Sequence, residues 1–111
     1  MTHSNKPNQK HGLKGFKSYQ IAVELFHFCQ KHQVPGFLKN QLDRASSSVV
    51  LNLAEGFGKR SLKDQKRFYS ISLGSLREVQ SILEISHADS KLINRADLCG
   101  AYLWRLIYPK N

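Results

Sequence analysis

Apolar side chains recur at the spacing of an α-helix in four separate segments, and this pattern constrains the fold of the 111-residue chain more than any other feature. The plainest case is the second segment, where the apolar positions are Leu38, Leu42, Ala45, Val49 and Leu53. Steps of three and four residues put all of them on one face of a helix. No segment alternates apolar and polar residues with period two over more than a few residues, so the sequence predicts an all-α protein without strands.

The first and third helices follow from the same period. The first is expected from about Phe16 to Cys29, and the Val-Pro-Gly sequence at 34–36 then breaks the chain. Its predicted apolar face holds Tyr19, Ala22, Val23, Phe26 and Cys29, with Ile21, Leu25 and Phe28 flanking it. The third helix is expected over residues 62–88, because Ser61 followed by Asp64 resembles a capping box.

The fourth helix is predicted to open at Asn94 and to end at Pro109. Its apolar positions are read as Leu98, Ala101, Tyr102 and Leu106. The short connections between four such helices favour an antiparallel up-down-up-down four-helix bundle with a short fourth helix. We expect residues 15–111 to form this bundle and residues 1–14, which are basic and contain no acid, to form a flexible N-terminal arm.

Three glycines mark particular positions in these helices. Gly56 and Gly58 are expected to end the second helix, one of them as a left-handed C-terminal cap. Gly74 lies in the middle of the third helix, where glycine costs about 1 kcal/mol relative to alanine. A close backbone contact is therefore predicted at Gly74.

The charge balance indicates which partners the chain attracts. Seventeen Lys and Arg residues face eight Asp and Glu residues, giving a formal net charge of +9. Such a charge attracts polyanions, although a basic surface that is merely solvated is the alternative. The sequence contains no apolar run long enough to cross a bilayer and no apolar leader near its start, so we expect a cytoplasmic protein.

Residue patterns that support catalysis or metal binding are missing from the sequence. Cys29 and Cys99 lie far apart in apolar helical patterns and are expected to be small buried side chains. The carboxylates lack the paired Glu-x-x-His pattern of a di-metal bundle, and Glu55 and Glu78 are interpreted as paired polar residues inside the bundle. We therefore expect no enzymatic activity, no cofactor and no metal.

Five cations gather around the end of the second helix and the start of the third. They are Lys59, Arg60, Lys63, Lys66 and Arg67, with Arg44 and Arg77 as supporting candidates. The stretch Gly56–Arg60 could cradle a nucleotide, but it does not follow a strand, and a turn whose basic residues touch a nucleic-acid backbone is the favoured interpretation. Phe68 and Tyr69 could stack on unpaired bases or pack in the core, and their spacing favours the core. The cluster could also be an ordinary solvated face.

The residues from Gln41 to Gly56 resemble the four helix bundle proteins, also called 23S rRNA intervening-sequence proteins. The resemblance continues through Gly58-Lys59-Arg60 and Arg67-Phe68-Tyr69 to the segment 73–80, and covers about residues 13 to 88. It implies an up-down-up-down bundle and adds no catalytic residues. The family is similar to the accessory variability determinant of diversity-generating retroelements, a homopentamer that binds nucleic acid and a reverse transcriptase.

Two functional hypotheses follow from the residues and the resemblance. The first is an oligomeric accessory protein, a pentameric ring by resemblance, that contacts the backbone of RNA or DNA through its basic surface. Apolar positions on the first and third helices exceed what one bundle core needs, which favours a further partner surface. The alternative is a protein-interaction scaffold that docks a partner such as a reverse transcriptase without binding nucleic acid directly.

Overall fold

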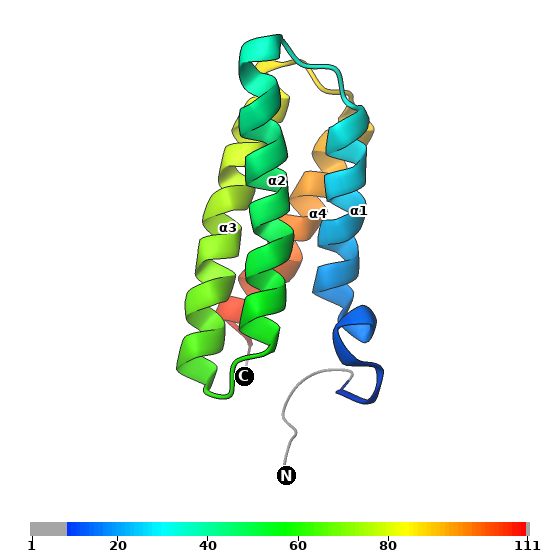
Figure 1. Cartoon of the computed structure of the whole chain (residues 1–111). Coiled ribbons are helices and arrows are strands. Elements are labelled where there is room, and N and C mark those ends of the chain that lie inside the picture. The colour runs from blue at the N-terminus through cyan, green and yellow to red at the C-terminus, as the bar shows by residue number, and fades with distance from the viewer. Residues whose placement is uncertain (1–8, 111) are drawn as a thin grey trace.

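The computed structural model describes residues 9–110, which form four α-helices preceded by a short 3-10 helix (Figure 1). The elements are η1 (Gln9–Gly15), α1 (Lys17–Lys31), α2 (Gly36–Phe57), α3 (Leu62–Ile85) and α4 (Ser90–Ile107). Within this part of the chain there is no strand, as the sequence predicts. Each loop between α-helices has four residues, and each joins two helix ends that lie at the same end of the bundle in Figure 1.

The core lies between the four helices, with α2 packed against α1 and α3, and α4 packed against α3 and α1. The predicted stripe of α2 is confirmed, because all five of its apolar positions are buried. The largest fully buried side chains are leucines from every helix: Leu25, Leu42, Leu53, Leu76, Leu83 and Leu103. Cys29 and Cys99 are also buried, and burial raises the pKa of each thiol to about 12.

The rotation of α1 and α4 differs from the prediction. In α1 the buried apolar residues are Ile21, Ala22, Leu25 and Cys29, so one predicted flank forms the core. In α4 the buried stripe is Leu92, Ala96, Cys99, Leu103 and Ile107, whereas Leu98 and Ala101 are exposed. Both helices carry apolar residues on adjacent flanks, and the period alone does not decide which flank is buried.

The start of α4 lies four residues before the predicted Asn94. Asp89 is the N-cap, and its Oδ1 accepts a hydrogen bond from the backbone N–H of Leu92 at 2.9 Å. With 18 residues α4 is longer than the 15-residue α1, so the prediction of a short fourth helix was wrong. The predicted cap of α3 is confirmed, because Ser61 Oγ accepts from the N–H of Asp64 at 3.1 Å.

Small residues bring α2 and α3 close together. Ser48 and Ser75 share a hydrogen bond of 2.8 Å between their hydroxyls, and the buried Ser72 hydroxyl donates to the Val49 carbonyl at 2.7 Å. Near the loop, a Cβ on Gly56 would lie 2.7 Å from Cε1 of Tyr69. Gly56 therefore serves close helix packing.

The predicted left-handed glycine cap was wrong. Gly56 lies inside α2, and Gly58 caps the helix with a right-handed φ of −81°. Gly74 also differs from the prediction, because a Cβ there would meet nothing within 4 Å. Open space faces Gly74, and the tight contact between α2 and α3 is made at Gly56.

The predicted arm of residues 1–14 overlaps the described structure only in part. Residues 1–8 lie outside the described residues, whereas η1 covers residues 9–15. Leu13 packs against the core, and its carbonyl accepts a hydrogen bond from the N–H of Phe16 at 3.0 Å. In residues 9–110, none of the helices combines the length and the hydropathy needed to cross a membrane.

Candidate nucleic-acid interface

The loop between α2 and α3, residues 58–61, is fixed by hydrogen bonds at both of its ends. The N–H of Lys59 donates to the Gly56 carbonyl at 3.1 Å, which continues the last turn of α2. The Gln65 side chain donates back to the Lys59 carbonyl at 3.0 Å, and Ser61 caps α3. These bonds fix the backbone positions from which the cations of this loop extend.

Three aromatic side chains pack beneath this loop. The ring centroids of Phe16 and Phe57 are 4.9 Å apart, and those of Phe16 and Tyr69 are 6.2 Å apart. These rings join the start of α1, the end of α2 and the start of α3. Burial raises the pKa of the Tyr69 hydroxyl to about 12, so it stays neutral at physiological pH.

Five of the seven predicted site residues come together at the loop, and we call them the loop cluster: Lys59, Arg60, Lys63, Lys66 and Arg67. Lys59 and Arg60 lie in the loop, and the other three lie on the first two turns of α3 at spacings of three and four residues. Arg60, Lys63 and Arg67 are exposed, while Lys59 and Lys66 are half-buried. Within residues 9–110 the cluster has one ion pair, Lys59 Nζ to Glu55 Oε2 at 3.1 Å.

Phe68 and Tyr69 have different environments. Tyr69 is buried in the core, which confirms the favoured interpretation for that residue. Phe68 is half-buried, and its ring centroid lies 5.1 Å from Lys59 Nζ and 4.5 Å from Arg67 Cζ. The ring therefore orients two members of the loop cluster through cation–π contacts.

Arg44 and Arg77 lie away from the loop cluster. Arg77 is ten residues beyond Arg67 on α3, about 15 Å along the helix axis. Its guanidinium donates to Gln80 Oε1 at 3.0 Å. Arg44 is exposed in the first half of α2, whose start lies at the opposite end of the bundle from the loop (Figure 1).

Three basic residues that the sequence analysis did not select lie at the same end as the loop cluster. Lys17 begins α1, Arg105 lies in the last turn of α4, and Lys110 follows that helix. The start of α1 and the end of α4 share the end of the bundle that holds the α2–α3 loop (Figure 1). The signal that could have found them was their place at the first residue of one helix and in and after the last turn of another.

The acidic residues do not form a metal site. In the part of the chain from 9 to 110, no group of three or more His, Cys, Asp or Glu side chains is placed to hold a metal ion. Glu55 and Glu78 are both exposed, so their predicted place inside the bundle was wrong. Glu55 is nevertheless paired, with Lys59.

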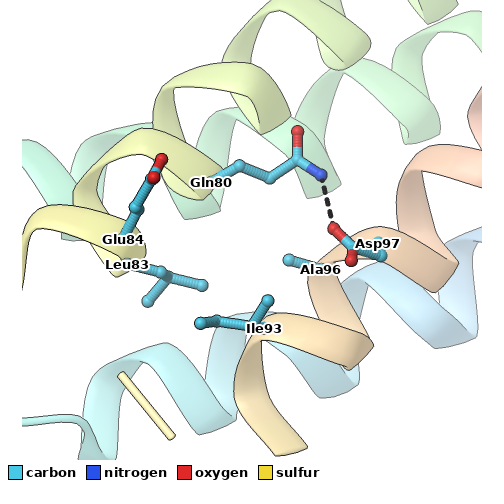
Figure 2. A pocket seen from close by; sticks show the side chains of 6 residues that line it. All are labelled: Gln80, Leu83, Glu84, Ile93, Ala96 and Asp97. Carbon is cyan, nitrogen blue, oxygen red and sulfur yellow. Dashed lines mark hydrogen bonds between the residues drawn. The ribbon is translucent and has the colours of Figure 1, made fainter. Parts of the chain in front are cut away.

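A groove of about 260 Å³ lies between α3 and α4, away from the loop cluster (Figure 2). It is lined by Gln80, Leu83, Glu84, Ile93, Ala96 and Asp97. Figure 2 shows Leu83, Ile93 and Ala96 facing one another, while the Gln80 amide donates to Asp97 Oδ1 at 3.0 Å. Besides three apolar side chains and this internally satisfied pair, the groove offers only the Glu84 carboxylate to orient a ligand.

Comparison with protein families identifies the chain. The family model described as 23S rRNA-intervening sequence protein matches residues 16–99, from the residue before α1 into α4. The chain therefore belongs to this family. No curated protein and no solved structure matches the chain significantly.

Proposed function

We propose that this member of the 23S rRNA-intervening sequence protein family is a cytoplasmic, up-down-up-down bundle that binds nucleic acid as an oligomeric accessory protein. It contacts the backbone of RNA or DNA and carries out no catalysis. The family description supports an association with RNA. The loop cluster is the surface that carries the proposal.

The observation that carries it is the density of positive charge at the fixed α2–α3 loop and the first two turns of α3. Five cations lie within nine consecutive residues, and one ion pair with Glu55 offsets them among the described residues. Mutual repulsion makes such a concentration unfavourable unless anions neutralise it. Phosphate groups do so, and each cation that contacts a phosphate releases condensed counterions.

The chemistry of the cluster favours contacts that position the backbone without reading bases. Lysine and arginine on exposed helix turns reach phosphate oxygens, which carry no sequence information. Phe68 already contacts Lys59 and Arg67, and Tyr69 is buried, so neither offers an open ring face for stacking on a base. We therefore expect weak discrimination between sequences.

Exposed apolar side chains support self-association or a protein partner. The most exposed of them, each above half exposed, are Phe37, Leu51, Leu62, Ile85, Trp104 and Tyr108. Trp104 and Tyr108 form a pair on α4 with ring centroids 4.3 Å apart. Large exposed rings of this kind are enriched at protein interfaces, and they favour a scaffold that docks a protein such as a reverse transcriptase as the second candidate.

The proposal is tested by binding of nuclease-treated protein to structured RNA and duplex DNA across a salt series. The variant Lys59→Glu/Arg60→Glu/Lys63→Glu is compared with a control of equal charge change, Lys31→Glu/Arg44→Glu/Lys91→Glu, in the opposite half. Loss of three phosphate contacts should flatten the slope of log K against log salt by about 2.7 and weaken binding about 500-fold at 0.1 M salt.

Three results would speak against the proposal. They are affinity that does not change with salt, equal losses in the two triple variants, and no binding at low salt. In the last case, capture of a protein partner that survives nuclease treatment would favour the scaffold. The mass of the assembly in solution tests the expected pentamer, which has five times the 12.7 kDa chain mass.

A further inference from the structure

Charge is distributed unevenly along the bundle. Among residues 12–110, the half with the α2–α3 loop holds nine cations, namely the loop cluster together with Lys14, Lys17, Arg105 and Lys110. Among residues 12–110 this half holds two acids, Glu55 and Asp64, which leaves a local charge of +7. We call this half the basic end; it is the lower half of the bundle in Figure 1.

The opposite half is electrically balanced. Its six cations are Lys31, Lys39, Arg44, Arg77, Lys91 and Arg95. Its six acids are Glu24, Asp43, Glu78, Glu84, Asp89 and Asp97. This half also contains ion pairs: Lys39 Nζ lies 2.9 Å from Asp43 Oδ1, and the Arg95 guanidinium contacts the Glu24 carboxylate.

The cations of the basic end come from segments far apart in the sequence, and the fold positions two of them, Lys17 and Arg105, at the same end of the bundle as the loop cluster. Lys17 stands between the buried residues Phe16 and Ser18 at the start of α1, so its position is set by the core. Arg105 is held in the last turn of α4, where its guanidinium lies 4.9 Å from the ring of Tyr102. Neither residue has an ion pair within the described part of the chain.

The size of the basic end matches a short double helix. The two short dimensions of the molecule are 25 and 21 Å. A duplex carries one phosphate charge per about 1.7 Å of axis, so a 25 Å segment of about seven base pairs carries about fifteen charges, and about half of these face one side. The +7 of the basic end is therefore close to the charge of the facing backbone.

We propose that a nucleic-acid duplex binds across the basic end as a whole, so that Lys17 and Arg105 contact phosphates together with the loop cluster. This inference rests on the proposed function and adds the geometry of binding. The duplex meets the end of the bundle, and the sides that carry Arg44 and Arg77 do not contribute. RNA and DNA duplexes share the phosphodiester chemistry involved, and the experiment compares them.

The test measures anisotropy of labelled 20-base-pair duplexes of RNA and DNA with the full-length chain. Lys17→Glu/Arg105→Glu, which leaves the loop cluster intact, is compared with Arg44→Glu/Lys91→Glu, which changes the net charge equally in the balanced half. The first variant should lose about 60-fold in affinity at 0.1 M salt and flatten the salt slope by about 1.8. The control should lose less than about 3-fold.

Each variant of a second pair removes one negative charge and introduces no acid among the cations of the basic end. Glu55→Gln removes the acid that pairs with Lys59 and should tighten binding several-fold, whereas Glu78→Gln, exposed in the balanced half, should leave affinity unchanged. The inference would be overturned if Lys17→Glu/Arg105→Glu and Arg44→Glu/Lys91→Glu changed the affinity equally, or if Glu55→Gln and Glu78→Gln did so. Retained binding in Lys17→Glu/Arg105→Glu, with loss in the loop-cluster triple variant, would also overturn it while leaving the proposed function standing. No binding by the unaltered chain would overturn both.

Discussion

Two glycines in the bundle should respond to the same substitution with opposite signs. A Cβ on Gly56 would lie 2.7 Å from Cε1 and 2.9 Å from Cδ1 of Tyr69, and 3.1 Å from the carbonyl oxygen of Gln65. A Cβ on Gly74 would meet nothing within 4 Å. We therefore predict that Gly56→Ala destabilises the fold and that Gly74→Ala stabilises it.

The magnitudes follow from the two environments. Gly74 is exposed in the middle of α3, where alanine should add about 0.5–1 kcal/mol to the free energy of unfolding. Gly56 lies one residue from the end of α2, so the gain in helix propensity is smaller there. Its clash is with a buried ring and a backbone oxygen, which cannot move away freely, and overpacking of this kind costs about 1–3 kcal/mol. The two variants should thus differ by about 1.5–4 kcal/mol.

Urea unfolding followed by circular dichroism, at one fixed protein concentration, measures both free energies. For a domain of this size, 1 kcal/mol corresponds to about 4–8 °C in Tm, so thermal scans should separate the variants by roughly 6 °C or more. Gly56→Ala with a stability equal to or above that of Gly74→Ala would refute the close packing of α2 on α3. Because this packing positions the α2–α3 loop, Gly56→Ala should also weaken nucleic-acid binding.

Two further predictions concern the start of α4 and the buried thiols. Asp89→Ala should cost about 1 kcal/mol in the free energy of unfolding, because it removes the N-cap of α4. Asn94→Ala should be neutral or slightly stabilising. Equal costs of the two variants in urea unfolding would contradict the cap at Asp89. Cys29 and Cys99, whose pKa burial raises to about 12, should resist iodoacetamide at pH 8 until the protein unfolds. Labelling of the native protein at pH 8 would contradict burial of the thiols. An unfolded thiol ionises near pH 8.5, so the stability that the raised pKa contributes is full below that pH and is lost as the pH rises towards 12. The urea midpoint should therefore fall across this range.

The existence of the helices could be predicted from the sequence, whereas their rotation could be predicted only in part. In α2 the apolar positions form one narrow stripe with polar residues on both sides, so the period identifies the buried face. In α1, Leu25 and Phe26 lie on adjacent flanks, and the core takes Leu25. The choice depends on the neighbouring helices, because a rotation of about one residue leaves the period unchanged.

The start of α4 shows a second limit. Asp89 and Asn94 are both residues that cap helices well, and local sequence does not rank them. Packing decides which of the two residues caps α4, because the helical turn that follows Asp89 buries Leu92 and extends the buried stripe of α4 by one turn. Gly74 shows the same limit, since a mid-helix glycine does not reveal whether a neighbour approaches or open space faces it.

The loop cluster could be predicted because its five cations are close in sequence, whereas the basic end as a whole could not. Lys17 and Arg105 are 88 residues apart in the numbering, yet the start of α1 and the end of α4 lie at one end of the bundle (Figure 1). The net charge of +9 gives no indication of this separation.

The separation matters because charges act locally in salt. The screening length is about 8 Å at physiological ionic strength, much shorter than the 49 Å length of the molecule. A phosphate that approaches the basic end therefore responds to the local charge there. The balanced half, which has no net charge, contributes little to the attraction of phosphates. The net charge should accordingly be a poor guide to affinity: substitutions that change it equally in the two halves should shift the isoelectric point alike, yet binding should follow the charge at the basic end.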